Sequence, residues 1–173
     1  YPATPYQTLE VAGLTAEKSF KLAKRNELLS QGYASWKTAG AKVIVDRLTT
    51  TYRKNTAGAD DPSYLDLNTK QILSYLRYDL RNFFQTRFAR CKLAEDDYPY
   101  KGNVITPKSA KALVIARYRQ WQEQELVQDP GDVFSKKIRV EINAKDRRLL
   151  DLYVPAHVMG QLRSPHPWIA SRI

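Results

Sequence analysis

The chain has 173 residues, of which 43% are hydrophobic and 27% are charged, and it contains three Trp, eleven Tyr and five Phe. This composition is typical of a folded globular chain with one sizeable core, and it excludes intrinsic disorder as the general state of the chain. The formal net charge of +10 favours an acidic partner, but charge alone does not decide among nucleic acid, an anionic membrane surface and an acidic protein.

Cysteine content and hydropathy indicate the cellular compartment of the chain and whether it crosses a membrane. Cys91 is the single cysteine, which excludes an internal disulfide and indicates a reducing, cytoplasmic origin. No apolar run approaches the ~18 residues that a transmembrane helix needs, and the first residues show no signal-peptide pattern. Because the chain begins at Tyr1 and has its one Met at position 159, we interpret it as a piece of a longer protein.

The beginning of the chain predicts an extended segment and a short helix. Residues 1–16 are rich in Pro and Thr and are expected to be extended. The segment 20–32 predicts an amphipathic helix, and Gly32 suits the position just past its end. Three leucines are expected to provide the apolar contacts of this helix, namely Leu22, Leu28 and Leu29.

A β-hairpin is predicted next. Alternation and β-branched residues indicate strands in 33–37 and 42–52, joined by a turn at 38–41. The loop 53–62 combines Gly, Asn, Asp and Pro and is expected to break regular structure.

Two long helices are predicted in the middle of the chain. The first begins near Asp66 or Asn68, since either side-chain oxygen can cap a helix. The second begins at Thr106 and Pro107 and runs to about Glu125. The apolar residues of the first helix recur every four positions and predict a broad buried face, namely Ile72, Leu76, Leu80, Phe84 and Phe88.

The last predicted elements are two strands, 136–142 and 148–155. Their connection is too short for a parallel crossover, so we expect them to pair antiparallel. The predicted fold class is therefore α+β, with two principal helices packed on a small, mainly antiparallel sheet.

The sequence contains no arrangement that predicts catalysis or a cofactor. His157 and His166 have no second ligand at metal-binding spacing, and Cys91 has no clearly placed histidine base. Neither a phosphate-binding glycine loop nor a GxSxG motif occurs. The acidic residues of 60–61 and 95–97 are expected to be solvated in loops. We therefore expect no enzyme activity, no cofactor, and no catalytic or metal-binding residues.

Basic residues are the remaining signal, and they gather in 69–92 and 136–148. A nucleic-acid module would add exposed aromatic residues for stacking. Phe84 and Phe88 instead share the stripe of Ile72 and are expected in the core. A solvated face or a contact to an acidic protein is the simpler interpretation of these charges. A basic nucleic-acid-binding domain is the alternative, and a fragment of an enzyme is a weaker third hypothesis.

Several short phrases follow one another in a specific order. The first are TTY at 50–52, SYLD at 63–66, NT at 68–69 and YLRY at 75–78. The later ones are KLA at 92–94, ITPK at 105–108, RQW at 119–121, ELV at 125–127 and VP at 154–155. Together they resemble the C-terminal part of the Mu-like family of contractile phage tail sheath proteins.

The resemblance implies a structural subunit that uses neither a cofactor nor hydrolysis. Such subunits polymerise into a helical sleeve around the tail tube and contract to drive the tube through the bacterial envelope during genome injection. The implied partners are other sheath subunits, a tube protein with an acidic surface, and the baseplate and tail terminator proteins. The implied location is the virion tail, with assembly in the host cytoplasm; neither a membrane nor nucleic acid is expected as a partner.

The resemblance also implies where such a subunit touches its partners. In this family a charged helix of the domain contacts the tube. The leading candidates for a contact with the tube or with a neighbouring subunit are therefore Lys108, Lys111 and Arg119. The next candidates are Arg77 and Arg81.

The resemblance divides the chain into three regions. These are the end of a preceding sheath domain with the hairpin at 1–45, the conserved C-terminal sheath domain at 46–163, and a C-terminal arm at 164–173. Members of the family usually end in an apolar, alternating strand that links subunits, but Pro165 and Pro167 here each remove a backbone donor. The linking role is therefore expected only in the last six residues, namely Trp168, Ile169, Ala170, Ser171, Arg172 and Ile173.

Overall fold

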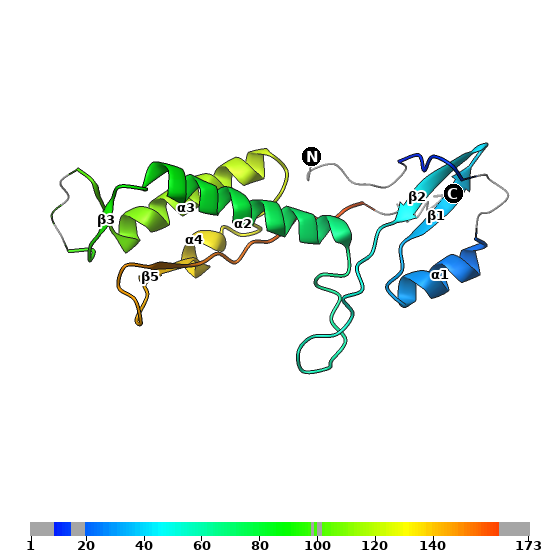
Figure 1. Cartoon of the computed structure of the whole chain (residues 1–173), viewed down its shortest axis with the longest axis horizontal. Coiled ribbons are helices and arrows are strands. Elements are labelled where there is room, and N and C mark those ends of the chain that lie inside the picture. Colours follow the sequence, from blue (N-terminus) through cyan, green and yellow to red (C-terminus); the bar gives the residue numbers. More distant parts are fainter. Residues whose placement is uncertain (1–8, 15–19, 98, 100–101, 163–173) are drawn as a thin grey trace, which may run out of the picture.

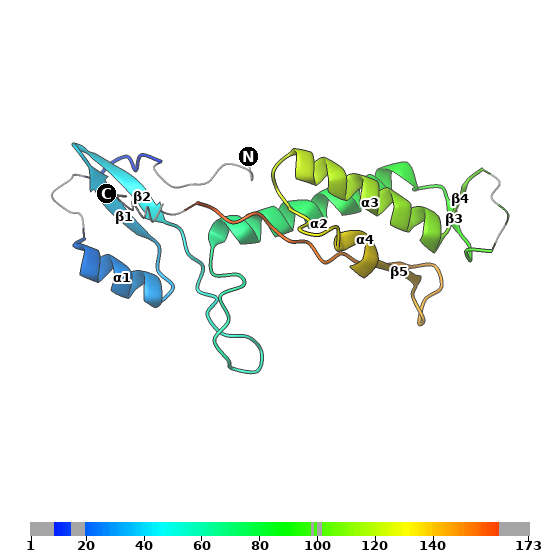
Figure 2. The same ribbon diagram turned by 180° about the vertical axis from the view of Figure 1, so that it is seen from behind.

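The computed structural model describes residues 9–14, 20–97, 99 and 102–162. The predicted α+β class is confirmed, and α2 and α3 are its two principal helices (Figures 1 and 2). In chain order the elements are α1 (Leu22–Ser30), β1 (Ser35–Ala39), β2 (Lys42–Arg47), α2 (Leu67–Arg87), β3 (Lys92–Leu93), β4 (Val104–Ile105), α3 (Pro107–Glu123), α4 (Phe134–Lys137), β5 (Arg139–Ile142) and β6 (Leu150–Tyr153).

The described strands form three separate two-stranded ladders rather than one sheet. β1–β2 and β5–β6 are antiparallel, and β3–β4 is parallel. Figure 1 shows α1 with the β1–β2 hairpin at one end of the molecule, while α2 and α3 lie side by side in the other part. β5 packs against α3, so the β5–β6 ladder belongs to the helical core, to which Ile105 of β4 also contributes.

The short N-terminal helix ends as predicted but contributes less apolar contact than expected. Leu22 is 63% exposed, so the prediction that it packs was wrong, whereas Leu28 and Leu29 are half-buried. Gly32 has a φ of +84°, and a Cβ at this position would lie 3.1 Å from the Thr50 carbonyl oxygen. Both the left-handed backbone and the close approach require glycine just past the helix end.

The β1–β2 hairpin lies where the sequence placed it, but its second strand is shorter. β2 ends at Arg47 instead of at 52, because the chain then pairs with the segment that precedes α2. There the Thr50 N–H donates to the Leu65 carbonyl (2.7 Å) and the Leu67 N–H donates to the Leu48 carbonyl (3.2 Å). The other edge of β2 accepts the chain at Glu10, which bridges to Ile44.

α2 begins after Asp66, one of the two predicted caps, yet the Asp66 side chain makes no capping hydrogen bond. It instead accepts a hydrogen bond from Arg47 Nε (3.0 Å) and so ties the start of α2 to the end of β2. The predicted apolar stripe is buried over its first three members, Ile72, Leu76 and Leu80. The last two, Phe84 and Phe88, are only half-buried.

α3 begins at the predicted position. Thr106 and Ser109 form a reciprocal capping box, and Pro107 occupies the first turn. Its buried side is nearly inaccessible, with Ala110 and Val114 at 0% and Trp121 at 1% exposure. The segments after α3 complete the same core through Leu126, Val127, Phe134, Ile138 and Val140.

The predicted strand 136–142 is correct only in its second part. Residues 134–137 form the helical turn α4, so Lys136 and Lys137 lie in a helix and not in a strand. The Asp129 carboxylate accepts from the N–H groups of Val133 (2.9 Å) and Phe134 (3.0 Å), which fixes this turn. The predicted antiparallel pairing of the two last strands is confirmed by the register of β5 and β6.

Candidate assembly surfaces

A partly buried ion pair joins the two principal helices. Asp79 of α2 accepts hydrogen bonds through Oδ2 from Arg117 Nε (2.6 Å) and Trp121 Nε1 (2.8 Å) of α3. Burial opposes ionisation of Asp79, but these hydrogen bonds and the Arg117 charge outweigh it and lower the pKa of the carboxyl. The same carboxylate raises the pKa of Arg117, so both partners remain charged.

The basic residues predicted on α3 share one side of the helix. Lys108 and Arg119 are exposed and return to nearly the same angle around the axis, while Lys111 lies one turn from Lys108 and is half-buried. Among the residues that the structure describes, no carboxylate forms an ion pair with these three side chains. We call Lys108, Lys111 and Arg119 the α3 basic face.

The acidic loop before this helix is exposed, as expected, and two of its side chains also make structural contacts. The Asp96 carboxylate accepts from the Lys108 main-chain N–H (2.6 Å) and so satisfies a free amide in the first turn of α3. Glu95 forms an ion pair with Arg147 in the connection between β5 and β6. Both contacts cross long sequence separations and hold the N-terminus of α3 beside the β5–β6 ladder.

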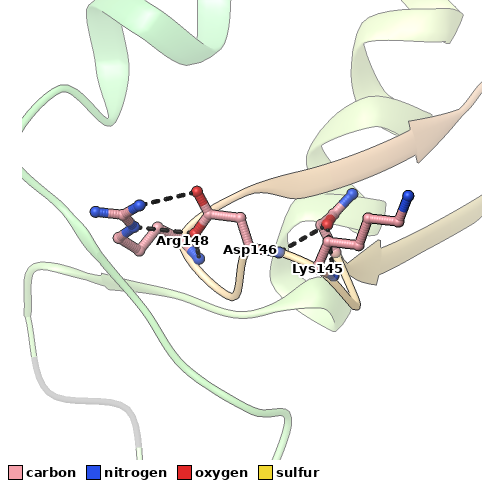
Figure 3. A network of polar contacts seen from close by, with 4 residues as sticks. Lys145, Asp146 and Arg148 are labelled. Carbon is pink, nitrogen blue, oxygen red and sulfur yellow. Dashed lines mark hydrogen bonds and ion pairs between the residues drawn. The ribbon is translucent and has the colours of Figure 1, made fainter.

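The connection between β5 and β6 is ordered by its own side chains (Figure 3). The Asn143 side-chain oxygen accepts from the Lys145 N–H (2.8 Å), and Asp146 Oδ1 accepts from both the N–H (3.0 Å) and the Nε (2.9 Å) of Arg148. The Arg148 side chain lowers the pKa of the Asp146 carboxyl, with a further contribution from the Arg148 N–H. Arg148 is thereby held at the start of β6.

A groove of about 900 Å³ lies between α2 and β6, and we call it the α2–β6 groove. Arg77 and Arg81, both exposed, line it from α2, and Arg148 lines it from the chain entering β6. Its apolar wall includes Leu80, Phe84, Phe88, Leu93, Leu150 and Leu152. Sequence reasoning placed Phe84 and Phe88 in the core, whereas the structure leaves them half-buried beside this groove.

The five predicted contact residues therefore fall on two surfaces. Asp79 faces α3, and residues two positions away along α2 point about 200° from it, so Arg77 and Arg81 project away from α3. The sequence analysis missed the Asp79–Arg117 pair, which sets this arrangement, and missed Arg148. A lone carboxylate within an arginine-rich helix was the signal for Asp79.

The predicted arm residues Trp168, Ile169, Ala170, Ser171, Arg172 and Ile173 lie outside the described residues. Within the part of the chain that the structure describes, no three His, Cys, Asp or Glu side chains come together in an arrangement that could hold a metal ion. In that same part, no helix has both the length and the apolarity needed to cross a membrane.

Comparison with known proteins identifies relatives of this chain. A family model for the phage tail sheath C-terminal domain matches residues 59–162. The Mu-like prophage FluMu tail sheath protein of Haemophilus influenzae is 32% identical over 167 residues, which are 94% of this chain and 34% of that protein. The crystal structure of a sheath tail protein from Desulfitobacterium hafniense is similar with a TM-score of 0.59 at 10% identity, covering 82% of this chain and 31% of that chain.

The chain thus spans about a third of the length of these two proteins. The structural likeness, at 10% identity, shows a shared fold. The family match rests on sequence and includes α2, α3, β5 and β6, the elements that carry both basic surfaces. The chain belongs to the phage tail sheath C-terminal domain family, as its ordered phrases had indicated.

Proposed function

We propose that this chain is part of a structural subunit that polymerises with other sheath subunits into the contractile sheath of a phage tail. The sheath surrounds the tail tube, and its contraction drives the tube through the bacterial envelope for genome injection. Subunits that repack release energy stored in the extended assembly, so the sheath uses neither a cofactor nor hydrolysis. The protein is located in the virion tail and assembles in the host cytoplasm. The baseplate protein and the tail terminator protein contact the two ends of the sheath.

The α3 basic face is the feature that supports the proposed contact with the tail tube. Lys108 and Arg119 are exposed on one side of a helix whose other side is buried, and the described residues offer them no carboxylate partner. Charge pairs at a wet surface are individually weak and can break and re-form. Such pairs suit a subunit that must hold an acidic tube in one state and release it in another.

Charge reversal on α3 tests this contact. We expect Lys108→Glu, Lys111→Glu and Arg119→Glu together to reduce co-sedimentation of the protein with purified tail tubes at least tenfold. The matched control is Lys136→Glu, Lys137→Glu and Lys145→Glu, which changes the same number of charges at exposed residues outside this face. Equal tube binding by the two triple variants, both with native circular dichroism, would refute the α3 contact.

The C-terminal arm is the proposed link between sheath subunits. Strand addition suits this role because main-chain hydrogen bonds can join neighbours through an extended segment. Deletion of residues 164–173 is expected to abolish polymerisation of the sheath, and Trp168 to Ile173 are the residues expected to pair. Normal sheaths from the truncated protein would show that the linking segment lies elsewhere.

A further inference from the structure

The α2–β6 groove has the size and the lining of a small-molecule site. Its volume of about 900 Å³ falls within the range of roughly 300–1,000 Å³ that is typical of ligand pockets. Leu, Ile and Phe side chains form most of its wall, and Phe84 and Phe88 of α2 and Leu150 and Leu152 of β6 are only half-buried there. A bound molecule can therefore remove further apolar surface from water, which favours a ligand with a large hydrocarbon part.

The charged side chains that line the groove all have the same sign. Among the described residues they are Arg77, Arg81 and Arg148, with no Asp or Glu beside them. Arg148 is paired with Asp146, whereas no described carboxylate forms an ion pair with Arg77 or Arg81. These two guanidinium groups lie one helical turn apart on one side of α2. They favour an anionic group on the ligand, and a carboxylate suits a guanidinium because it can accept two parallel hydrogen bonds.

The two kinds of lining follow one another along α2. Phe84 and Phe88 lie about one and two turns beyond Arg81 on the same side of the helix, and the groove continues past the helix end to Cys91. The helix rises about 17 Å from Arg77 to Phe88. A ligand whose anionic group lies at the arginines therefore has room for an elongated hydrocarbon chain along the two phenylalanines.

The groove offers little to a ligand with many hydroxyl or ring-nitrogen groups. Apart from the arginines, the polar side chains of its described lining are Gln85 and the weakly polar thiol of Cys91. Sugars and nucleosides are held in place by several hydrogen bonds, and their polar groups would lose water here without new partners. A molecule with one charged end and an otherwise apolar body has no such cost.

We propose that the α2–β6 groove binds a long-chain fatty acid. Its carboxylate pairs with Arg77 and Arg81, and its acyl chain lies along Phe84 and Phe88 towards Cys91. A cationic amphiphile of the same length would place its charge beside arginines, with no carboxylate in the described lining to receive it. This site belongs to the folded chain itself, so the proposal does not rest on the sheath function.

A titration series tests the chemical class of the ligand. This chain is titrated in a calorimeter with octanoate, decanoate and dodecanoate, each below the concentration at which it forms micelles. Burial of one CH₂ group strengthens binding about fourfold, so we expect each two-carbon extension to tighten binding at least fivefold. Dodecyltrimethylammonium, with the same chain and the opposite charge, should bind at least tenfold more weakly than dodecanoate. Absence of dodecanoate binding, equal binding of the two dodecyl compounds, or no dependence on chain length would overturn the proposal.

Charge-neutralising variants test the position of the carboxylate. Arg77→Gln with Arg81→Gln is expected to weaken dodecanoate binding at least tenfold. The matched control is Lys136→Gln with Lys137→Gln, which removes two exposed positive charges outside the groove and should change the affinity less than twofold. Equal losses in the two double variants, both with native circular dichroism, would show adsorption of an amphiphile to a basic protein and refute the site.

The thiol of Cys91 reports on the position of the acyl chain. Cys91 is the single cysteine of the chain, is half-buried and lines the groove, so its alkylation by iodoacetamide is an unambiguous signal. Saturating dodecanoate should slow this reaction at least fivefold in the wild type. An unchanged rate with dodecanoate bound would place the fatty acid elsewhere on the molecule and refute the proposal.

Phosphatidylglycerol vesicles separate a free fatty acid from a membrane lipid as the ligand. The vesicles carry the same kind of chain and a negative charge, but their chains are held in a bilayer. We expect them to change the alkylation rate of Cys91 less than twofold. Protection of Cys91 by vesicles and not by dodecanoate would assign the groove to a membrane surface and overturn the proposal.

Discussion

Asp79 Oδ2 lies 2.8 Å from Trp121 Nε1 and accepts its hydrogen bond, joining α2 to α3. Arg117 donates to the same carboxylate, and its guanidinium also lies 5.6 Å from the centre of the Phe83 ring. These contacts fix which side of α2 faces α3. Arg77 and Arg81 are consequently turned away from the α3 basic face, and the domain presents two basic surfaces in different directions.

Removal of the Asp79 charge is expected to destabilise the domain. Asp79→Asn should lower the free energy of unfolding by about 2 kcal/mol, because Arg117 then loses its carboxylate partner at a site where the Asp79 side chain is only 12% exposed. The loss is expected below that of a fully buried pair, since the Arg117 side chain is 29% exposed. Urea denaturation followed by circular dichroism measures the change.

Glu27→Gln is the matched control for Asp79→Asn. It neutralises a carboxylate whose ion pair with Lys24 is about half exposed on both sides, and such pairs contribute at most about 0.5 kcal/mol. Similar losses in the two variants would mean that the Asp79 pair is no more important than a surface contact.

Stability should depend on pH through Asp79. Its pKa is lower in the folded protein than the unfolded value of about 4. The folded state therefore gains stability from this group above the unfolded pKa and loses it as the pH falls through the folded pKa. We expect the difference in free energy of unfolding between the wild type and Asp79→Asn to shrink from about pH 5 downward. A difference that stays constant from pH 6 to pH 2 would contradict the lowered pKa.

The end of α3 is expected to be stabilised by glycine. Glu125 has a φ of +57°, and the Leu126 N–H donates to the Trp121 carbonyl (3.0 Å) around it, as in a Schellman motif. A side chain in this left-handed conformation costs about 1 kcal/mol, so Glu125→Gly should raise the free energy of unfolding by about that amount. Glu125→Ala keeps the Cβ and should leave stability nearly unchanged. Equal urea midpoints for the Gly and Ala variants would refute this explanation.

Capping residues and apolar periodicity in the sequence predicted the two long helices well. Contacts between residues far apart in the sequence determine the segments that were predicted wrongly. Thr106 and Pro107 specify the start of α3 through neighbours only a few residues away, and the structure begins the helix there. Lys136 and Lys137 looked like the start of a strand, but the Asp129 carboxylate caps this segment as a helical turn and the Phe134 ring stacks on Tyr118 at 3.6 Å. Neither contact leaves a periodic signal in the sequence.

For the candidate surfaces too, the sequence predicted the residues but not their arrangement in space. Arg77, Arg81, Lys108 and Arg119 could be named from charge and resemblance, because each stands in a helix with a clear apolar side. Their separation onto two surfaces could not be predicted, since it depends on how α2 is rotated against α3 by Asp79. Likewise, Phe84 and Phe88 are only half-buried beside the groove that β6 also lines, and no local pattern specifies this position of β6.

Electron microscopy of the longest polypeptide that carries this sequence tests the central claim most directly. A sheath subunit is expected to form hollow tubes with regular, cog-wheel striations, both alone and around purified tail tubes. Soluble particles that form no tubes and bind DNA with a steep salt dependence would contradict the sheath assignment and favour a basic nucleic-acid-binding domain.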